Sequence, residues 1–256
     1  MKKLGFIGTG TISAAFIEGL VASGKNNPIL VSPRSREISA ELSEKFAQVR
    51  RAGSNTEVAE ASDIIFLGMR PPQVEEALDG IAFRKEQIVC SFVAGLTTDE
   101  LRKIVPNAQI CRVLPLPAIA SGKGPVAHFP AVPEILEILA GMGEVVLPRA
   151  ETELTAMGAI SGVMSTFMQL GDTLKSWLVD RNVETATADI YVRALFVGLA
   201  DTALHSPLSL LELADDHQTK GGLNERTRQH LVESGWFSEV TNAIEGVQKV
   251  RREDLD

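Results

Sequence analysis

The segment Gly8-Thr9-Gly10 constrains this chain most, because it stands between a short apolar run and a helical pattern. Residues 4–8 are typical of a buried strand, and residues 12–23 carry apolar side chains at helical spacing. Glycines at such a junction let an anion approach the backbone, where exposed N–H groups and the helix dipole attract negative charge. The junction therefore predicts a binding turn for the pyrophosphate of a dinucleotide.

The remainder of the first half alternates strand-like and helical segments. Apolar, strand-like runs occupy residues 29–31, 63–68, 88–92 and 109–113, and helical patterns occupy residues 36–48, 74–78 and 98–105. Continuous apolar strands separated by helices indicate a parallel sheet covered on both faces. We therefore expect residues 1–148 to form an α/β, Rossmann-type domain with a doubly wound parallel sheet.

The second half has a different character. Helical periodicity extends over residues 151–180, 184–204 and 235–250, with no convincing strand, so residues 149–256 are expected to form an all-helical dimerisation and substrate domain. Residues 154–171 carry no formal charge, but Thr155, Ser161 and Gln169 make this stretch too polar for a membrane helix. It is expected to be buried or to face a second subunit.

Composition excludes several classes of function. The chain of 256 residues has a formal net charge of −8, whereas binding to nucleic acid requires clustered Lys and Arg. Cys90 and Cys111 lack the spacing of a thiolate metal site or a disulfide framework, and no two histidines have metal-ligand spacing on one helix face. We therefore expect a cytoplasmic protein that binds no metal, membrane or nucleic acid.

The end of the second predicted strand bears on the choice of dinucleotide. An acidic residue there would bind both ribose hydroxyls and repel a 2′-phosphate. The chain has no carboxylate at this point; Ser32, Arg34 and Ser35 offer hydroxyls and a guanidinium that suit a phosphate. This pattern favours NADP over NAD, and a solvated loop arginine is the alternative interpretation.

Short motifs follow in order along the chain. They are Gly5-Phe6-Ile7-Gly8-Thr9-Gly10, Arg34-Ser35, residues 54–58, residues 63–71, Ala94-Gly95-Leu96, Ser161-Gly162 and Gly221-Gly222. In this order and spacing the chain resembles the pyrroline-5-carboxylate reductases from end to end. The resemblance implies proline biosynthesis: NADPH-dependent reduction of a cyclic imine, pyrroline-5-carboxylate, to proline, by hydride transfer to the C=N carbon. It also implies a homodimer or a higher homo-oligomer of dimers.

The same resemblance implies roles for individual residues. The expected cofactor contacts are Gly8, Gly10, Thr11, Ile12, Ser13, Ser32, Arg34, Ser35, Asn55, Met69, Arg70, Pro71 and Ala94, with backbone amides of Thr11, Ile12 and Ser13 on the pyrophosphate. The expected substrate contacts are Pro115, Ser161, Gly162, Gly221 and Gly222, with Thr219 and Asn224 as candidate catalytic residues. No strong acid or base is required, because the cofactor carries the chemistry.

The chain departs from the family at the substrate motifs. The family's Arg-x-Met-Pro-Asn-Thr-Pro-Ala is replaced by residues 112–118, one residue shorter and without the two polar groups, and its Gly-Gly-Thr-Thr becomes Gly221-Gly222-Leu223-Asn224. Each lost charge-assisted hydrogen bond to a carboxylate costs roughly 1.5–3 kcal/mol. Two alternatives therefore stand: a paralogous NADPH-dependent reductase of another imine or carbonyl compound, and a non-catalytic NADP-binding regulatory protein.

Other ionisable residues are interpreted as structural or solvated. The four histidines are His128, His205, His217 and His230, and of these His217 is nearest to the glycine turn of the substrate motif. Lys175 was compared with the helix lysine of β-hydroxyacid dehydrogenases, which has an asparagine four residues later. Here that position is Val179, so a surface or interface lysine is expected.

Overall fold

The computed structural model describes the backbone of residues 1–253 and the side chains of residues 1–248. Its residues form two compact units, Met1–Gly158 (unit 1) and Ala159–Asp256 (unit 2). The boundary lies later than the 148/149 position expected from the sequence. The first turn of helix α7 (Glu151–Ile160) is held in unit 1, because Glu151 pairs with Arg112 and accepts hydrogen bonds from Thr98.

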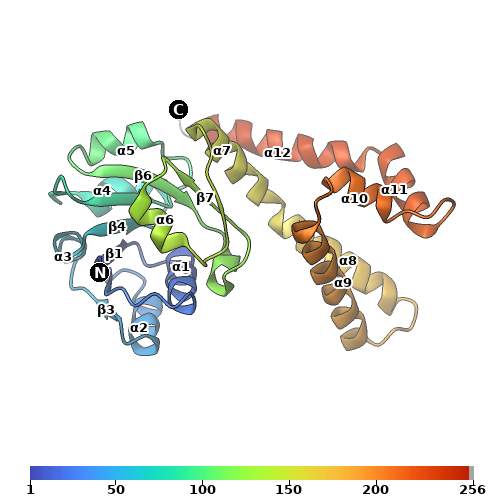
Figure 1. The fold of residues 1–256 in the computed structure, drawn as a ribbon, viewed down its shortest axis with the longest axis horizontal. Coiled ribbons are helices and arrows are strands. Elements are labelled where there is room, and N and C mark those ends of the chain that lie inside the picture. Colours follow the sequence, from blue (N-terminus) through green and yellow to red (C-terminus); the bar gives the residue numbers. More distant parts are fainter. Residues whose placement is uncertain (254–256) are drawn as a thin grey trace. The chain divides into compact units, whose positions relative to one another are not determined.

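In the described part of unit 1, eight strands form one sheet in the order β3-β2-β1-β4-β5-β6-β7-β8 (Figure 1). The strands are β1 Leu4–Ile7, β2 Ile29–Val31, β3 Val49–Arg51, β4 Ile64–Leu67, β5 Ile88–Ser91, β6 Gln109–Leu114, β7 Pro125–Phe129 and β8 Glu144–Val146. Strands β6 and β7 are antiparallel, and the other neighbouring pairs are parallel. The predicted α/β class, a doubly wound and mostly parallel sheet followed by helices, is confirmed.

Helices cover both faces of the sheet. They are α1 Thr11–Ala22, α2 Arg36–Lys45, α3 Asn55–Ala61, α4 Val74–Leu78, α5 Thr98–Ile104 and α6 Pro133–Leu139, with 3-10 turns η1 Pro71–Gln73 and η2 Pro117–Ser121. Successive strand residues alternate between faces: in β4, Phe66 packs in the core cluster that includes α1, α2 and α6, whereas Leu67 packs in the cluster that includes α3, α4 and α5. The sheet is thus buried on both sides.

Three strands and two helices of unit 1, α3 and α6, were not expected. Strand β3 has only Val49 buried among its three residues, so it lacks the apolar run that reveals a strand. Strand β8 has no fully buried residue, and β7 includes a buried histidine, His128. These strands extend the sheet beyond the predicted parallel core and add its antiparallel pair.

Cys90 on β5 and Cys111 on β6 are partners in the register of the parallel pair. Both are free and buried. Burial, followed by the neighbouring Cys111 thiol, raises the pKa of the Cys90 thiol. Cys90 therefore packs as a protonated thiol beside Cys111 in the core, which agrees with the apolar context seen in the sequence.

Unit 2 is helical throughout its described residues. Its elements are η3 Ser161–Val163, α8 Met164–Val179, α9 Thr185–His205, α10 Leu210–Asp216, α11 Leu223–Glu233 and α12 Trp236–Glu253. The single helix predicted over residues 151–180 is divided into α7, η3 and α8, and helix α10 was not predicted. Within the described residues, none of the helices combines the length and apolar character needed to cross a membrane.

His128 is a buried side chain with both ring nitrogens bonded. Its Nδ1 donates to the Arg112 carbonyl at 2.9 Å, and its Nε2 accepts from the Val132 N–H at 2.9 Å. A carbonyl only accepts and an N–H only donates, so the ring is a neutral imidazole with its proton on Nδ1. The structural role expected for His128 follows from these bonds. Burial lowers its pKa below the ordinary value of 6.5.

We expect this histidine to make stability depend on pH. Because its pKa is lower in the folded state than in the unfolded state, its contribution is present above the unfolded pKa and is lost as the pH falls below it. Urea unfolding of the wild type and His128→Gln, between about pH 7.5 and about pH 5.5, measures this. At the higher pH the variant should be less stable by about 1–3 kcal/mol, and the gap should narrow on acidification. Parallel profiles for the two proteins would contradict the assignment.

Candidate cofactor and substrate sites

The predicted pyrophosphate turn joins the carboxyl end of β1 to the first turn of α1. Gly8 has φ +89°, and a Cβ there would stand 2.6 Å from the Gly68 carbonyl oxygen, so this position requires glycine. Gly10 is the N-cap of α1 with φ −93°, and the nearest atom to a Cβ built there is 4.0 Å away. The backbone is therefore open to a ligand at Gly10, and the turn fits the pyrophosphate of a dinucleotide.

Side chains from both flanking elements hold this turn. The Gly8 N–H donates to Ser32 Oγ at 3.0 Å, and Ser13 Oγ donates to the Gly8 carbonyl at 2.7 Å. Thr9 Oγ1 donates to the Ser32 carbonyl at 3.2 Å. Ser32, which the sequence placed at the 2′-phosphate, is fully buried. Because β2 lies beside β1, the Ser32 hydroxyl bonds the glycine turn, and its contact with a 2′-phosphate stays a prediction.

The loop between β2 and α2 presents positive charge. Arg34 and Arg36 are exposed, and Ser35 is the N-cap of α2 in the left-handed region at φ 59°. Arg51 lies beside the end of β2 in the register with Val31, and its Nε donates to Ser39 Oγ on α2 at 2.9 Å. Arg36 and Arg51 were not predicted from the sequence. Recognition of the short strand β3 would have revealed Arg51.

The other expected cofactor residues follow the carboxyl ends of β4 and β5. Met69, Arg70 and Pro71 lie between β4 and α4, and Ala94 is exposed after β5. Strand order reverses between β1 and β4, which in such sheets is where a dinucleotide binds, with its two halves on opposite sides of that point.

Two further expected residues lie near this edge: one is hydrogen-bonded to another helix, and the other is buried. The Asn55 side-chain amide donates to the Ala77 carbonyl at 2.9 Å, so this group ties α3 to α4. Pro115 follows β6 directly and is buried. Any contact from Asn55 to an adenosine would need its remaining N–H or its carbonyl oxygen.

In unit 2 the turn between α10 and α11 brings together the expected substrate residues Thr219, Gly221, Gly222 and Asn224. The Gly222 N–H donates to the Thr219 carbonyl at 2.7 Å, and the Asn224 amide donates to the His217 carbonyl at 2.8 Å. Thr219 and Asn224 are both exposed. Ser161 and Gly162 lie on a different element of the unit, η3.

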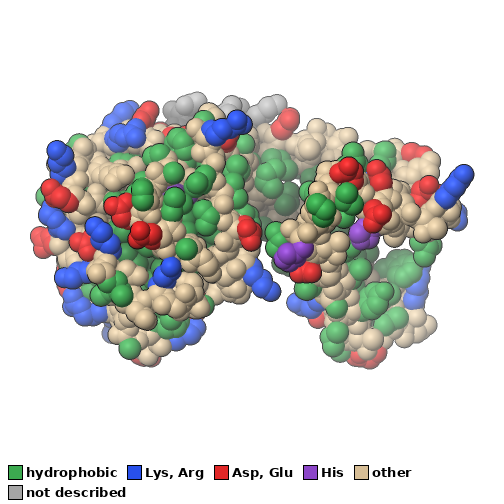
Figure 2. Space-filling view, in the orientation of Figure 1, with side chains coloured by type: hydrophobic (Ala, Val, Ile, Leu, Met, Phe, Trp, Pro, Cys, Tyr) green, Lys and Arg blue, Asp and Glu red, His purple; other side chains and the backbone are tan. Residues whose placement is uncertain are grey.

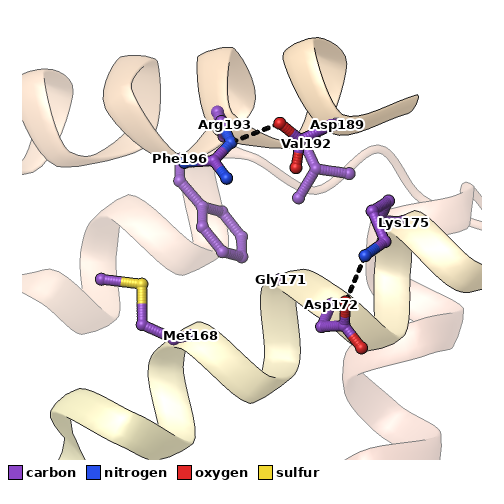
Figure 3. A pocket seen from close by; sticks show the side chains of 8 residues that line it. All are labelled: Met168, Gly171, Asp172, Lys175, Asp189, Val192, Arg193 and Phe196. Atoms are coloured by element: carbon purple, nitrogen blue, oxygen red, sulfur yellow. Dashed lines mark hydrogen bonds and ion pairs between the residues drawn. The ribbon is translucent and has the colours of Figure 1, made fainter. Parts of the chain in front are cut away.

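Lys175 lines a pocket of about 220 Å³ between α8 and α9 (Figure 3). It pairs with Asp172, and Arg193 pairs with Asp189 at 2.6 Å on the facing helix. The remaining lining is mostly apolar: Met168, Gly171, Val192 and Phe196. The charges cancel in two pairs, so the pocket offers no excess charge to a ligand. Lys175 is an ion-paired helix residue, and no asparagine accompanies it.

Comparisons with known proteins agree with this geometry. A family model described as NADP oxidoreductase, coenzyme F420-dependent, matches residues 3–95. Pyrroline-5-carboxylate reductase 2 of Bacillus subtilis is 27% identical over 262 residues, covering 97% of this chain and 94% of that protein. The pyrroline-5-carboxylate reductase of Escherichia coli is 37% identical over 119 residues, or 44% of each chain. A Plasmodium falciparum pyrroline carboxylate reductase, solved with NADP bound, has a TM-score of 0.81 at 20% identity, covering 96% and 95% of the two chains.

The sheet, the glycine turn and these likenesses define the class: the chain is an NAD(P)-dependent oxidoreductase with a Rossmann-type domain. Within that class the resemblance carried by the motifs is confirmed. The chain is similar over most of its length to pyrroline-5-carboxylate reductases, at 26–27% identity.

The two glycines of the turn allow a matched test. A Cβ at Gly10 meets nothing in the protein closer than 4.0 Å but occupies the space that the pyrophosphate needs. We expect Gly10→Ala to keep the wild-type melting temperature and to weaken NADPH binding at least about tenfold, followed by nicotinamide fluorescence. Gly8→Ala should instead lower the melting temperature, because φ is +89° and Gly68 blocks the Cβ. Tight NADPH binding by folded Gly10→Ala would refute the site.

Proposed function

We propose that this protein is an NADPH-dependent reductase of a cyclic imine, converting pyrroline-5-carboxylate to proline in the cytoplasm. The observation that carries the proposal is the glycine turn, open at Gly10 and followed by the basic loop after β2, in a chain that aligns over nearly its full length with a pyrroline-5-carboxylate reductase. The named activity belongs to the relatives. This chain's own residues supply the glycine turn after β1 for the pyrophosphate, the basic loop after β2 for the 2′-phosphate, and the polar turn between α10 and α11 in unit 2.

The residues present fit NADP. The first-turn amides of Thr11, Ile12 and Ser13 follow an N-cap glycine that has no side-chain cap, so they can donate to the pyrophosphate. Arg34 and Ser35 lie at the N-terminus of α2, without a carboxylate among residues 31–36, which suits a 2′-phosphate. When bound, NADPH supplies the hydride that reduces the C=N carbon.

The remaining work of the protein is binding, orientation and exclusion of water. Met69, Arg70, Pro71 and Ala94 flank the cofactor from the loops after β4 and β5. In unit 2, Thr219 offers a hydroxyl, and Asn224 has a second amide N–H beyond the one that bonds His217. We propose that these two donors, with Ser161, Gly162, Gly221 and Gly222 of the same unit, bind the substrate's carboxylate and ring nitrogen. Pro115 in unit 1 stays a predicted substrate contact.

A second candidate function is reduction of a different imine or carbonyl compound. It is favoured by the loop after β6, where Leu116 stands in the segment that carries two polar groups in the family, and by Leu223 after the glycine pair. The Asn224 amide is also partly engaged by the His217 carbonyl. A site with fewer donors binds a carboxylate more weakly, so a substrate with less negative charge would be preferred.

Unit 2 is proposed to form a homodimer. Most of the exposed large apolar side chains of the described residues lie on this unit, and Figure 2 shows hydrophobic side chains on its surface. Examples are Ile190 at 68% exposed, Val197 at 67% and Trp177 at 54%. Apolar surface of this extent on one helical unit is typical of a subunit interface.

The proposed reaction is tested by NADPH absorbance after addition of pyrroline-5-carboxylate, with NADH in parallel. We expect NADPH to be consumed with formation of proline, and NADH to be consumed more slowly. If NADPH binds but pyrroline-5-carboxylate is not reduced, a panel of cyclic and acyclic imines and ketones decides between the second candidate and a non-catalytic NADP-binding protein. Absence of NADPH binding would overturn the proposal.

The interface is tested by light scattering after size exclusion. We expect the wild type to be a dimer or a larger even oligomer, and Ile190→Asp combined with Val197→Asp to be monomeric, because two charges would be buried without partners. Leu147→Asp is the matched control, since Leu147 is 48% exposed on unit 1 and should leave the mass unchanged. A wild-type monomer would contradict the proposed homodimer.

A further inference from the structure

Arg112 is a buried arginine within β6, paired in register with Ser91 at the end of β5. Its residue is 8% exposed, and its guanidinium donates to Glu151 Oε1 at 2.8 Å and to the Val93 carbonyl at 3.4 Å. Its backbone carbonyl accepts from His128. Side chain and main chain of Arg112 are therefore both fixed by neighbouring elements of unit 1.

Glu151 links Arg112 to a further segment, the start of α5 at Thr98. This carboxylate accepts from Thr98 N and from Thr98 Oγ1, each at 2.8 Å, while it pairs with Arg112. Burial alone would raise the pKa of the Glu151 carboxyl, but the hydrogen bonds from Arg112 and Thr98 bring it below its ordinary value. The carboxylate is thus ionised at neutral pH, and both of its oxygens are engaged.

Stability alone does not account for this cluster. Among the described residues, Arg112 Nε is one of two buried side-chain polar atoms without a hydrogen-bond partner, which is unfavourable. Buried ion pairs are also often no more stabilising than apolar residues of similar volume. A buried arginine that is incompletely satisfied points to a requirement other than folding.

Arg112 and Glu151 contact the residues at both ends of the loop after β5, and Arg112 lies just before the loop after β6. Val93 comes directly before Ala94, and Thr98 begins α5, so the loop of residues 94–97 is held at its two ends. Arg112 precedes the buried Pro115 by three residues. Both loops follow β5 and β6, on the side of the switch point opposite to the β2 loop with its arginines. With the adenosine half at the β2 loop, as in the proposed function, the nicotinamide would lie at this half of the edge.

We propose that Arg112 and Glu151 are positioning residues whose ion pair fixes the loops after β5 and β6 against the nicotinamide half of the cofactor. The inference rests on the proposed function. Neither Arg112 nor Glu151 contacts the reacting atoms. They act by holding the backbone of Val93 and Thr98 and the segment that leads from Arg112 to Pro115. The adenosine half, bound at α2, is independent of them.

The test compares the wild type with Arg112→Met/Glu151→Leu, which replaces the pair by apolar side chains of similar volume, and with Glu151→Gln. The glutamine keeps one side-chain oxygen, which can accept from Arg112. Its amide nitrogen cannot accept the hydrogen bond that Thr98 Oγ1 donates to the second oxygen of Glu151. Arg102→Met, which removes an exposed ion pair with Asp99 on α5, is the control. Each protein is checked for folding by circular dichroism and thermal unfolding. Two probes are then used: 2′,5′-ADP for the adenosine half and NADPH for the whole cofactor.

We expect both pair variants to bind 2′,5′-ADP within about twofold of the wild type, and to lose most of the fluorescence change that marks an ordered nicotinamide. Where pyrroline-5-carboxylate is turned over, kcat should fall at least about tenfold in the double variant, with a smaller change in KM for NADPH. Arg102→Met should match the wild type in every measurement.

The outcomes separate the two proposals. Folded pair variants with wild-type NADPH fluorescence and wild-type kcat would overturn the positioning role and leave the proposed function standing. If the double variant does not fold, Glu151→Gln decides by the same two measurements. A wild type that binds no NADPH would overturn the proposed function, and this inference with it. A wild type that binds NADPH but does not reduce pyrroline-5-carboxylate leaves the fluorescence comparison to decide.

Discussion

The close approach of Gly8 and Gly68 is the constraint on which the cofactor edge depends. A Cβ at Gly8 would stand 2.6 Å from the Gly68 carbonyl oxygen, and one at Gly68 would stand 2.0 Å from Ser13 Oγ. The ends of β1 and β4 can meet only because both positions lack a side chain. This meeting point is where the strand order reverses, so the close packing of Gly8 and Gly68 places the turn that is open at Gly10 where such sheets bind dinucleotides.

Much of unit 1 could be predicted because its strands are continuous apolar runs. Residues 64–67 and 88–91 are buried on both faces, and a run of that kind has few other interpretations. Strand β3 escaped prediction because its pairing with β2, and not the burial of its side chains, makes it a strand. The role of Ser32 also depends on pairing: only the adjacency of β1 and β2 brings its hydroxyl to the Gly8 N–H.

Unit 2 was harder to predict for a related reason. Its helices show periodicity, but few of its side chains are fully buried, so the pattern alone does not say where one helix ends and the next begins. The expected helix over residues 151–180 is interrupted at η3, around Ser161 and Gly162. Gly221 and Gly222 lie in a turn after α10, as the sequence predicted. However, the hydrogen bond from the Asn224 amide to the His217 carbonyl depends on the shape of the turn, which the spacing of residues does not reveal.

Arg112 connects two polar groups of different kinds, the buried imidazole of His128 and the partly buried carboxylate of Glu151. Its carbonyl receives a hydrogen bond from neutral His128, and its guanidinium pairs with ionised Glu151. The imidazole fixes β6 against the segment after β7, and the carboxylate fixes it against α5 and α7. Apolar packing would bury these elements equally well, but it has no direction, whereas each hydrogen bond sets a distance and an angle. The loops that leave β5 and β6 therefore begin from a directionally fixed point, and in the proposed reaction this would set the geometry in which hydride donor and imine carbon meet.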